Sequence, residues 1–197
     1  LISKQNLLYY LIDTEKFSHL EEMKRILVEF ANKIDVINMN NIPMQHTIDL
    51  MKNKNQLQKK VVEFIKNADL YMDNFEYLDI DQIHFKFGEG EEKPEEKVLN
   101  IPDRIMDQIR LVSTYKGVPV PSMLFDSTGT KKIAALASYV IEALEQGRML
   151  VVDELDSSIH FKLTRAIVAM FNNELNTDAQ LIFTVHDIDL MDCKRMF

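Results

Sequence analysis

The final third of the chain alternates between predicted helices and strands, and this order constrains the fold more than any other feature. Helices are expected from about Thr130 to Gln146 and near Leu163–Phe171. The strands between and after them, Met149–Val152 and Leu181–Val185, are apolar throughout, which is typical of strands buried on both faces of a parallel sheet. We therefore expect an α/β fold with flanking helices. Polar residues at the carboxyl ends of these strands would lie where such sheets place ligands.

The first part of the chain is predicted to be mainly helical. From Thr14 to Ile34, apolar residues recur at spacings of three and four, which indicates an amphipathic helix with Thr14 as its N-cap. Pro43 is placed to begin a second helix that extends to about Met72. A coiled arm that binds a partner is the alternative, but strict heptads are not sustained.

The middle of the chain contains the clearest internal boundary. Alternating apolar and polar residues predict a strand at Ile83–Phe87. The following run, Gly88–Lys97, has no apolar residue, which indicates a solvated or disordered loop. At Gly117–Pro121 we expect turns or a break. The chain is thus divided into residues 1–100, a helical lobe with a short strand, and residues 101–197, the α/β part.

Composition narrows the classes of function. The chain has 31 acidic and 23 basic residues, and its net charge of -8 argues against a protein that coats nucleic acid over its whole surface, although a local basic patch stays open. Cys193 is the only cysteine of the 197 residues, so no intrachain disulfide can form, as in cytoplasmic proteins. No apolar run approaches the roughly 20 residues of a membrane helix. We expect a cytoplasmic protein without a membrane partner.

Two acidic residues follow the predicted strand in the segment MLVVDE. Asp153 and Glu154 are placed as in nucleotide-hydrolysing enzymes, where one carboxylate helps to hold Mg²⁺ and the next orients or deprotonates the attacking water. By itself the pattern is weak evidence for a catalytic site, because a turn that ends a strand also accounts for two acidic residues at this place.

Two further segments carry polar side chains at helix or strand ends. In DSTGTKK, the residues Ser127, Gly129, Thr130 and Lys131 offer a hydroxyl, an approachable backbone and helix-start amides that could accept a phosphate; an ordinary capped helix is the alternative. In TVHD, His186 follows an apolar strand and could contact a γ-phosphate, although a lone histidine there is often structural.

The order of these three segments resembles the ABC-type ATPase heads of the Rad50, structural-maintenance and overcoming-lysogenization-defect branch. DSTGTKK resembles the signature loop, MLVVDE the Walker B strand and TVHD the switch histidine. DSTGTKK and DELDSSIH look most similar to AAA-family ATPases of bacterial abortive-infection and other anti-phage systems. The resemblance covers about the last 75 residues and implies a C-terminal half of such a head, preceded by an inserted helical lobe.

The resemblance also implies roles for individual residues. Asp153 would lie in the Mg²⁺ shell, Glu154 would activate water and His186 would sense the γ-phosphate of ATP. Two heads would form a homodimer, or part of a higher oligomer, with the signature residues of one head at the nucleotide of the other. The residues implied at the D-loop and dimer interface are Ser157, Ser158 and His160.

Two departures from the family pattern matter. His160 stands at the D-loop position where many transporters and Rad50 relatives have Asp, although Ile159-His160 agrees with the defence branch. The five glycines cannot form a G-x-x-x-x-G-K-[ST] loop. In this family that loop precedes the inserted lobe, so we interpret its absence as truncation of a longer protein.

Three hypotheses of function follow from the resemblance. The first is an ATPase of anti-phage defence in which ATP-dependent dimerisation controls an effector, such as a nuclease on a partner protein. The second is a DNA-repair or chromosome-maintenance clamp, and the third is a scaffold that binds nucleotide without hydrolysis. Contact with nucleic acid stays open in each case.

Overall fold

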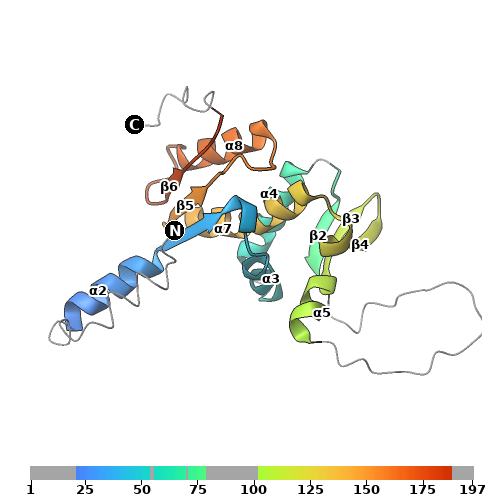
Figure 1. Ribbon diagram of the computed structural model, residues 1–197, viewed down its shortest axis with the longest axis horizontal. Coiled ribbons are helices and arrows are strands. Elements are labelled where there is room, and N and C mark those ends of the chain that lie inside the picture. The colour runs from blue at the N-terminus through green and yellow to red at the C-terminus, as the bar shows by residue number, and fades with distance from the viewer. Residues whose placement is uncertain (1–20, 54–55, 70, 79–101, 188–197) are drawn as a thin grey trace, which may run out of the picture.

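A parallel three-stranded sheet forms one end of the molecule. The computed structural model describes residues 21–53, 56–69, 71–78 and 102–187. Strands β1 (Ile34–Asn38), β5 (Met149–Asp153) and β6 (Gln180–Phe183) lie in the order β1-β5-β6, and both neighbouring pairs are parallel. The predicted α/β fold with a parallel sheet is confirmed, and Figure 1 shows the three strands side by side.

One face of this sheet packs against the long helix α7 (Thr128–Gln146) and the helix α8 (Phe161–Phe171). Leu150 and Val152 of β5 are almost fully buried in the core that these helices share. The register aligns Val36, Val151 and Ile182 in one row on the opposite face. Val36 is 41% exposed and Ile182 is 53% exposed, so this apolar row remains open to solvent in the described part of the chain.

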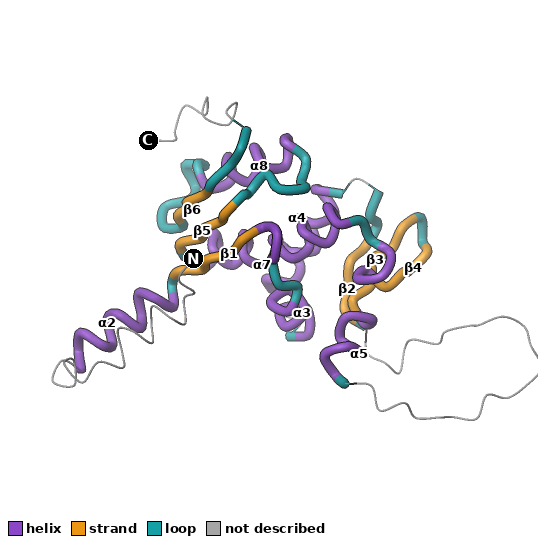
Figure 2. Tube along the Cα trace, in the orientation of Figure 1, coloured by secondary structure: helices purple, strands orange, loops and turns teal. Residues whose placement is uncertain are grey.

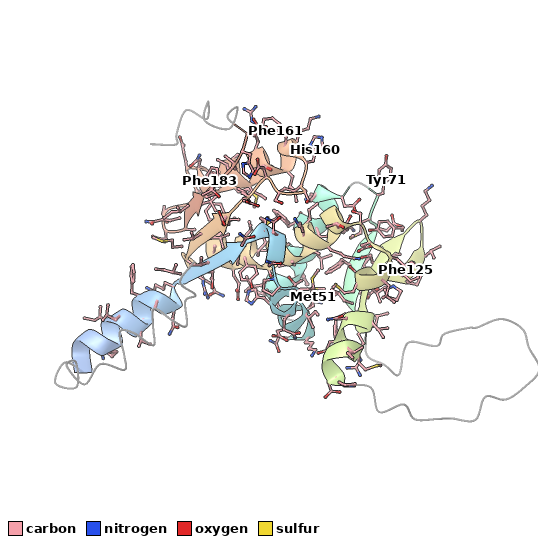
Figure 3. All side chains as sticks on the ribbon, in the orientation of Figure 1. Met51, Tyr71, Phe125, His160, Phe161 and Phe183 are labelled. Carbon is pink, nitrogen blue, oxygen red and sulfur yellow. The ribbon has the colours of Figure 1, made fainter. Side chains whose placement is uncertain are left out.

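Helices from the first part of the chain pack against α7. α3 (Gln45–Lys52) and α4 (Gln56–Ala68) contact α7, and the fully buried Met51 lies among them (Figure 3). Helix α2 (Glu21–Asn32) projects away from the other helices in Figure 1, and a short helical turn, η2 (Met39–Asn41), follows β1.

A second, antiparallel sheet lies at the other end of the molecule (Figure 2). It contains β2 (Asn74–Tyr77), β3 (Leu111–Tyr115) and β4 (Val118–Pro121), with α5 (Asp103–Arg110) before β3 and α6 (Ser122–Phe125) after β4. Lys116 and Gly117 join β3 to β4 with φ values of 50° and 77°, which is the left-handed geometry of a tight hairpin turn.

The structure corrects two predictions of secondary structure and decides between the alternatives of a third. The first helix ends at Asn32, and Ile34 starts a strand because its segment pairs with β5. The predicted helix from Pro43 to Met72 is two helices. At Gly117–Pro121 the first of the two alternatives, a turn, is confirmed, because the segment forms a hairpin with both prolines on the edge strand β4, where a missing N–H is tolerated.

Several other predictions fall outside the described residues. These are the helix start at Thr14, the strand Ile83–Phe87, the loop Gly88–Lys97 and Cys193. The division of the chain near residue 100 stays a prediction, although β1, from the first part, pairs with β5 of the second. Within the described ranges, no helix combines the length and the apolar character that crossing a membrane requires.

Candidate functional site

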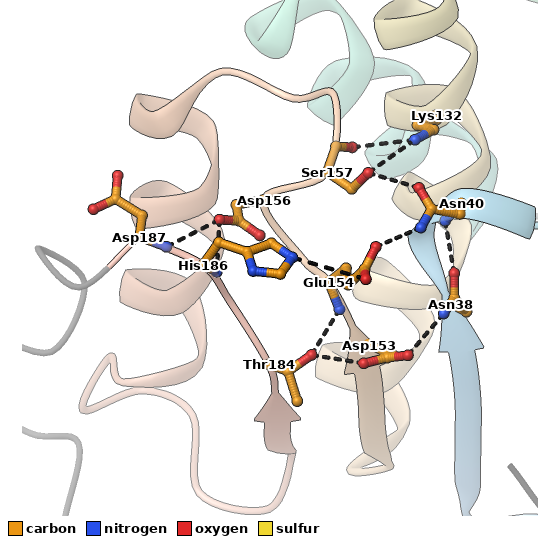
Figure 4. Close-up of polar contacts among 10 residues, drawn as sticks. All are labelled: Asn38, Asn40, Lys132, Asp153, Glu154, Asp156, Ser157, Thr184, His186 and Asp187. Atoms are coloured by element: carbon orange, nitrogen blue, oxygen red, sulfur yellow. Dashed lines mark hydrogen bonds and ion pairs between the residues drawn. The ribbon is translucent and has the colours of Figure 1, made fainter.

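Asp153 joins the carboxyl ends of all three parallel strands. Its Oδ2 accepts a hydrogen bond of 2.7 Å from Nδ2 of Asn38 at the end of β1. Its Oδ1 accepts one of 2.7 Å from Oγ1 of Thr184, directly after β6. Figure 4 shows Asp153 between these two side chains. The carboxylate is thus held in a fixed orientation at the edge of the sheet where parallel α/β folds bind ligands.

Glu154 is held beside Asp153 by its backbone and its side chain. Its N–H donates to Thr184 Oγ1 at 2.8 Å, and its φ is 57°, in the left-handed region that non-glycine residues rarely adopt. Its Oε2 accepts a hydrogen bond from Asn40 Nδ2, and its Oε1 lies 3.8 Å from His186 Nε2. This backbone conformation turns the Glu154 carboxylate away from the strand and toward the side chains of its neighbours (Figure 4).

His186 lies at the same edge but is far more exposed. Its backbone N–H donates to Asp156 Oδ2 at 2.9 Å, and the N–H of Asp187 donates to the same oxygen at 3.1 Å. The side chain of His186 is 79% exposed, against 33% for Glu154. The backbone of His186 is therefore fixed by Asp156, while its ring faces solvent, where it could meet a ligand.

The segment from Glu154 to Ser158 is a tight turn between β5 and α8. Leu155 is fully buried, and its N–H donates to Thr184 O at 2.9 Å. The N–H of Ser157 donates to Glu154 O at 2.8 Å, and Ser158 is a second left-handed residue, with a φ of 64°. The turn therefore begins and ends on strained, non-glycine backbone.

The start of α7 forms the cap that its sequence suggests. Ser127 is the N-cap, and its Oγ accepts a hydrogen bond of 3.1 Å from Thr130 N. Thr130 Oγ1 donates to Asp69 Oδ2 at 3.0 Å, and Lys131 N donates to Ser127 O at 3.0 Å. The alternative of an ordinary capped helix therefore describes the local geometry, and the phosphate-binding role of these residues stays a prediction.

The start of α7 and the turn after β5 are in direct contact. A Cβ atom added to Gly129 would lie 3.0 Å from Ser158 O. Lys132 Nζ donates to Ser158 Oγ at 3.1 Å and to Ser157 Oγ at 3.2 Å. The DSTGTKK segment therefore contacts the turn that follows MLVVDE within one chain.

The remaining predicted interface residue, His160, begins α8. Its Nδ1 accepts a hydrogen bond of 3.1 Å from Lys162 N, which makes it the N-cap of that helix (Figure 3). Ser127, Gly129, Ser158 and His160 line one open cleft of about 610 Å³. The predicted signature and interface residues thus share one surface.

The described residues fit a magnesium ion that one protein carboxylate and the phosphates of a bound nucleotide would hold together. Mg²⁺ prefers oxygen ligands and usually binds to one or two carboxylates together with water and substrate phosphates. Asp153 offers such oxygens, and each of them keeps a lone pair beyond its one hydrogen bond. No cluster of three or more His, Cys, Asp or Glu side chains in the described ranges could hold a metal alone. The phosphates of a nucleotide would have to complete the shell.

The comparison with known families is decisive for the class of protein. A family profile described as "AAA domain, putative AbiEii toxin, Type IV TA system" matches residues 29–192. The chain belongs to this AAA-domain family. A comparison with curated proteins finds no matching relative. Membership of the AAA-domain family implies nucleotide binding, typically with Mg²⁺, and supports an ATPase domain of the kind associated with toxin–antitoxin and abortive-infection systems.

The AAA-domain structure also adds residues that sequence reasoning missed. Asn38 and Asn40 hold the two carboxylates, and Thr184 binds both Asp153 and the backbone of Glu154. Lys132 links α7 to the turn after β5. Thr184 stands inside the TVHD segment, where its position at a strand end was a usable signal. The asparagines carried no such signal, because β1 itself was not predicted.

Proposed function

We propose that this chain is the C-terminal half of an ABC-type ATPase head of the Rad50, structural-maintenance and overcoming-lysogenization-defect branch, acting in bacterial anti-phage defence. ATP bound between two heads would set their association and thereby control an effector. The observation that carries this proposal is the fixed pair of carboxylates after β5, with Asp153 held between strand ends and Glu154 beside His186.

The arrangement supports distinct roles for the two carboxylates. Asp153, held by Asn38 and Thr184, is oriented as a ligand of the Mg²⁺ that accompanies ATP. Glu154 is one residue further and has its own hydrogen-bond partner, and this supports its proposed role of orienting or deprotonating the attacking water. His186 Nε2, 3.8 Å from Glu154 Oε1, can donate to a γ-phosphate or to that water. The bound Mg²⁺ would neutralise charge on the transferred phosphoryl group.

The rest of the nucleotide site would come from a segment outside this chain. The sequence has no glycine-rich phosphate loop. The row of Val36, Val151 and Ile182 on the open face of the parallel sheet supports this proposal, because parallel sheets normally bury both faces. A helix that follows the missing loop would cover such a face. ATP hydrolysis is therefore proposed for the intact protein.

We further propose that the heads dimerise through the surface that carries Ser127, Gly129, Ser158 and His160. These residues line one open cleft, so a partner head could contact all four of them together. Ser127, Gly129, Thr130 and Lys131 would then approach the nucleotide of the partner head, with Ser157 close to the same surface. A cytoplasmic location, a nuclease or similar effector as a partner, and contact with nucleic acid belong to the same proposal.

Replacement of Glu154 tests this function. In the intact protein, Glu154→Gln removes the base but preserves size, so phosphate release should fall by at least about 100-fold while ATP still binds. Glu63→Gln is the matched control, because Glu63 is exposed on α4. The readouts are phosphate release and retention of labelled ATP. Normal turnover in the Glu154 variant would remove Glu154 from this role.

A further inference from the structure

The carboxylate of Glu154 has one close hydrogen-bond donor among the described residues, and that donor comes from a distant segment. Asn40 lies in η2, 114 positions earlier in the chain, and its Nδ2 donates to Glu154 Oε2. On the other oxygen, His186 Nε2 is 3.8 Å away, which is too far for a hydrogen bond. The orientation of the Glu154 carboxylate therefore depends on Asn40.

Asn40 is itself fixed through its side chain and through its backbone. Its Oδ1 accepts a hydrogen bond of 2.8 Å from Ser157 Oγ. Its backbone N–H donates to Asn38 Oδ1 at 2.8 Å, and Asn38 also holds Asp153. The end of β1 and the turn η2 thus each place one asparagine against a carboxylate.

Donor chemistry fixes the direction of this chain of contacts. Lys132 Nζ has only hydrogens to offer, so Ser157 Oγ must accept from it at 3.2 Å. Ser157 then donates its own hydrogen to Asn40 Oδ1, and this leaves Nδ2 of Asn40 facing Glu154. A flipped Asn40 amide would set two acceptors, Oδ1 and the carboxylate, against each other. The carboxylate of Glu154, which can only accept, therefore selects the orientation of Asn40, and Ser157 links Asn40 to Lys132 on the second turn of α7 (Figure 4).

We propose that Asn40 is a positioning residue for Glu154, and that Lys132 and Ser157 connect this position to the start of α7. The inference rests on the proposed role of Glu154 as the residue that activates water. Its consequence is that a displacement of the start of α7 weakens the hydrogen bond between Asn40 Nδ2 and the Glu154 carboxylate. Contact between this helix and a second head would then change the rate of hydrolysis without any change in the residues that bind ATP.

The test measures ATP turnover by the intact protein with Asn40→Asp and Asn40→Ala. Asn40→Asp keeps the shape but sets a carboxylate against Glu154, and a displacement of about 1 Å in a reacting group costs about 100-fold in rate. We expect kcat to fall about 30-fold to 100-fold in Asn40→Asp and about 10-fold in Asn40→Ala, with KM for ATP within about twofold of normal. The matched control is Asn41→Asp, which adds the same charge one residue further, at another exposed position of the same turn.

A double-mutant cycle tests the connection to α7. Lys132→Met should lower kcat, and it should cause no further loss in an Asn40→Ala background, because both changes interrupt one chain of contacts. Losses that multiply would show that Lys132 acts separately and would overturn the connection.

Glu154→Gln, measured in the same series, separates the two levels of the argument. If Glu154→Gln is inactive while Asn40→Asp turns over normally, the positioning role is overturned and the proposed function stands. If Glu154→Gln turns over normally, the proposed function fails, and the role of Asn40 fails with it. A fall in kcat that is equal in Asn40→Asp and Asn41→Asp would also overturn the inference, because it would reflect charge alone.

Discussion

Asp126 is the residue whose replacement should destabilise the protein most strongly near the start of α7. It is 7% exposed and accepts three hydrogen bonds. Ser113 Oγ and Ser122 Oγ donate to its Oδ2 at 2.5 Å and 2.7 Å, and Tyr115 OH donates to its Oδ1 at 2.9 Å. Asp126 thereby ties the β3–β4 hairpin and α6 to the N-cap residue Ser127.

The expected magnitude follows from these three bonds. A hydrogen bond to a charged group contributes about 1.5–3 kcal/mol, and a buried hydroxyl left without a partner adds a penalty. Ser113 and Ser122 are fully buried, so Asp126→Ala should lower the free energy of unfolding by about 4 kcal/mol, a large share of the roughly 5–15 kcal/mol of a typical domain. Tyr115→Phe removes one of the bonds and should cost about 1–2 kcal/mol.

Urea unfolding of the intact protein, followed by circular dichroism, measures both changes. Tyr71→Phe is the matched control for Tyr115→Phe, because Tyr71 is 80% exposed and its change should stay within about 0.5 kcal/mol. Tyr115→Phe keeps the assay informative if Asp126→Ala does not fold. The reasoning is refuted if Asp126→Ala costs less than about 1 kcal/mol, or if the two tyrosine variants are equally stable.

Three further predictions concern other parts of the molecule. Ser127→Arg should prevent ATP-dependent dimerisation of the intact protein without preventing nucleotide binding, and size-exclusion chromatography with ATP that still shows a dimer would contradict the proposed interface. Gly147→Ala should cost about 1–2 kcal/mol in urea unfolding, because Gly147 has a φ of 62° and the added Cβ would lie 2.9 Å from Asp178 Cβ. A hydrogen bond with His46 lowers the pKa of Glu142, so the charged carboxylate stabilises the fold above its unfolded pKa of about 4.3, and this stability disappears as pH falls through the folded value. Glu142→Gln should therefore be less stable than the wild type by about 1 kcal/mol at pH 7, and the difference should disappear once the pH falls below the lowered, folded pKa of Glu142.

The second half of the fold was predictable because its signals are local. Ser127 caps α7 with its own side chain, and Gly147 ends that helix in the left-handed conformation that glycine favours. The apolar run of β5 stops at Asp153, as the sequence suggests. These features depend on neighbours in sequence, so the α7–β5–α8–β6 order could be predicted to within a few residues.

The first half was harder to predict because its structure depends on distant partners. Ile34 continues the apolar spacing of α2, yet it pairs with Met149, 115 positions later. The positions of Asn38 and Asn40 against the carboxylates follow from that pairing, so sequence reasoning could identify Asp153 and Glu154 but not the side chains that hold them. The role of Lys132 was unpredictable for the same reason, since its contacts with Ser157 require α7 and the turn after β5 to be adjacent in space.

The two left-handed residues at the ends of the Glu154–Ser158 turn give this segment a mechanical property. Neither is a glycine, and each costs about 1–2 kcal/mol in backbone energy relative to ordinary conformations. The contacts with Thr184, Asn40 and Lys132 keep the turn in this conformation. The turn therefore stores backbone strain, and the hydrogen bonds to these three side chains hold it in the strained conformation. A ligand that replaced one of these hydrogen bonds would allow one left-handed residue to relax. The relief of about 1–2 kcal/mol of backbone strain would change the ratio of two conformations of the turn by about 5-fold to 30-fold.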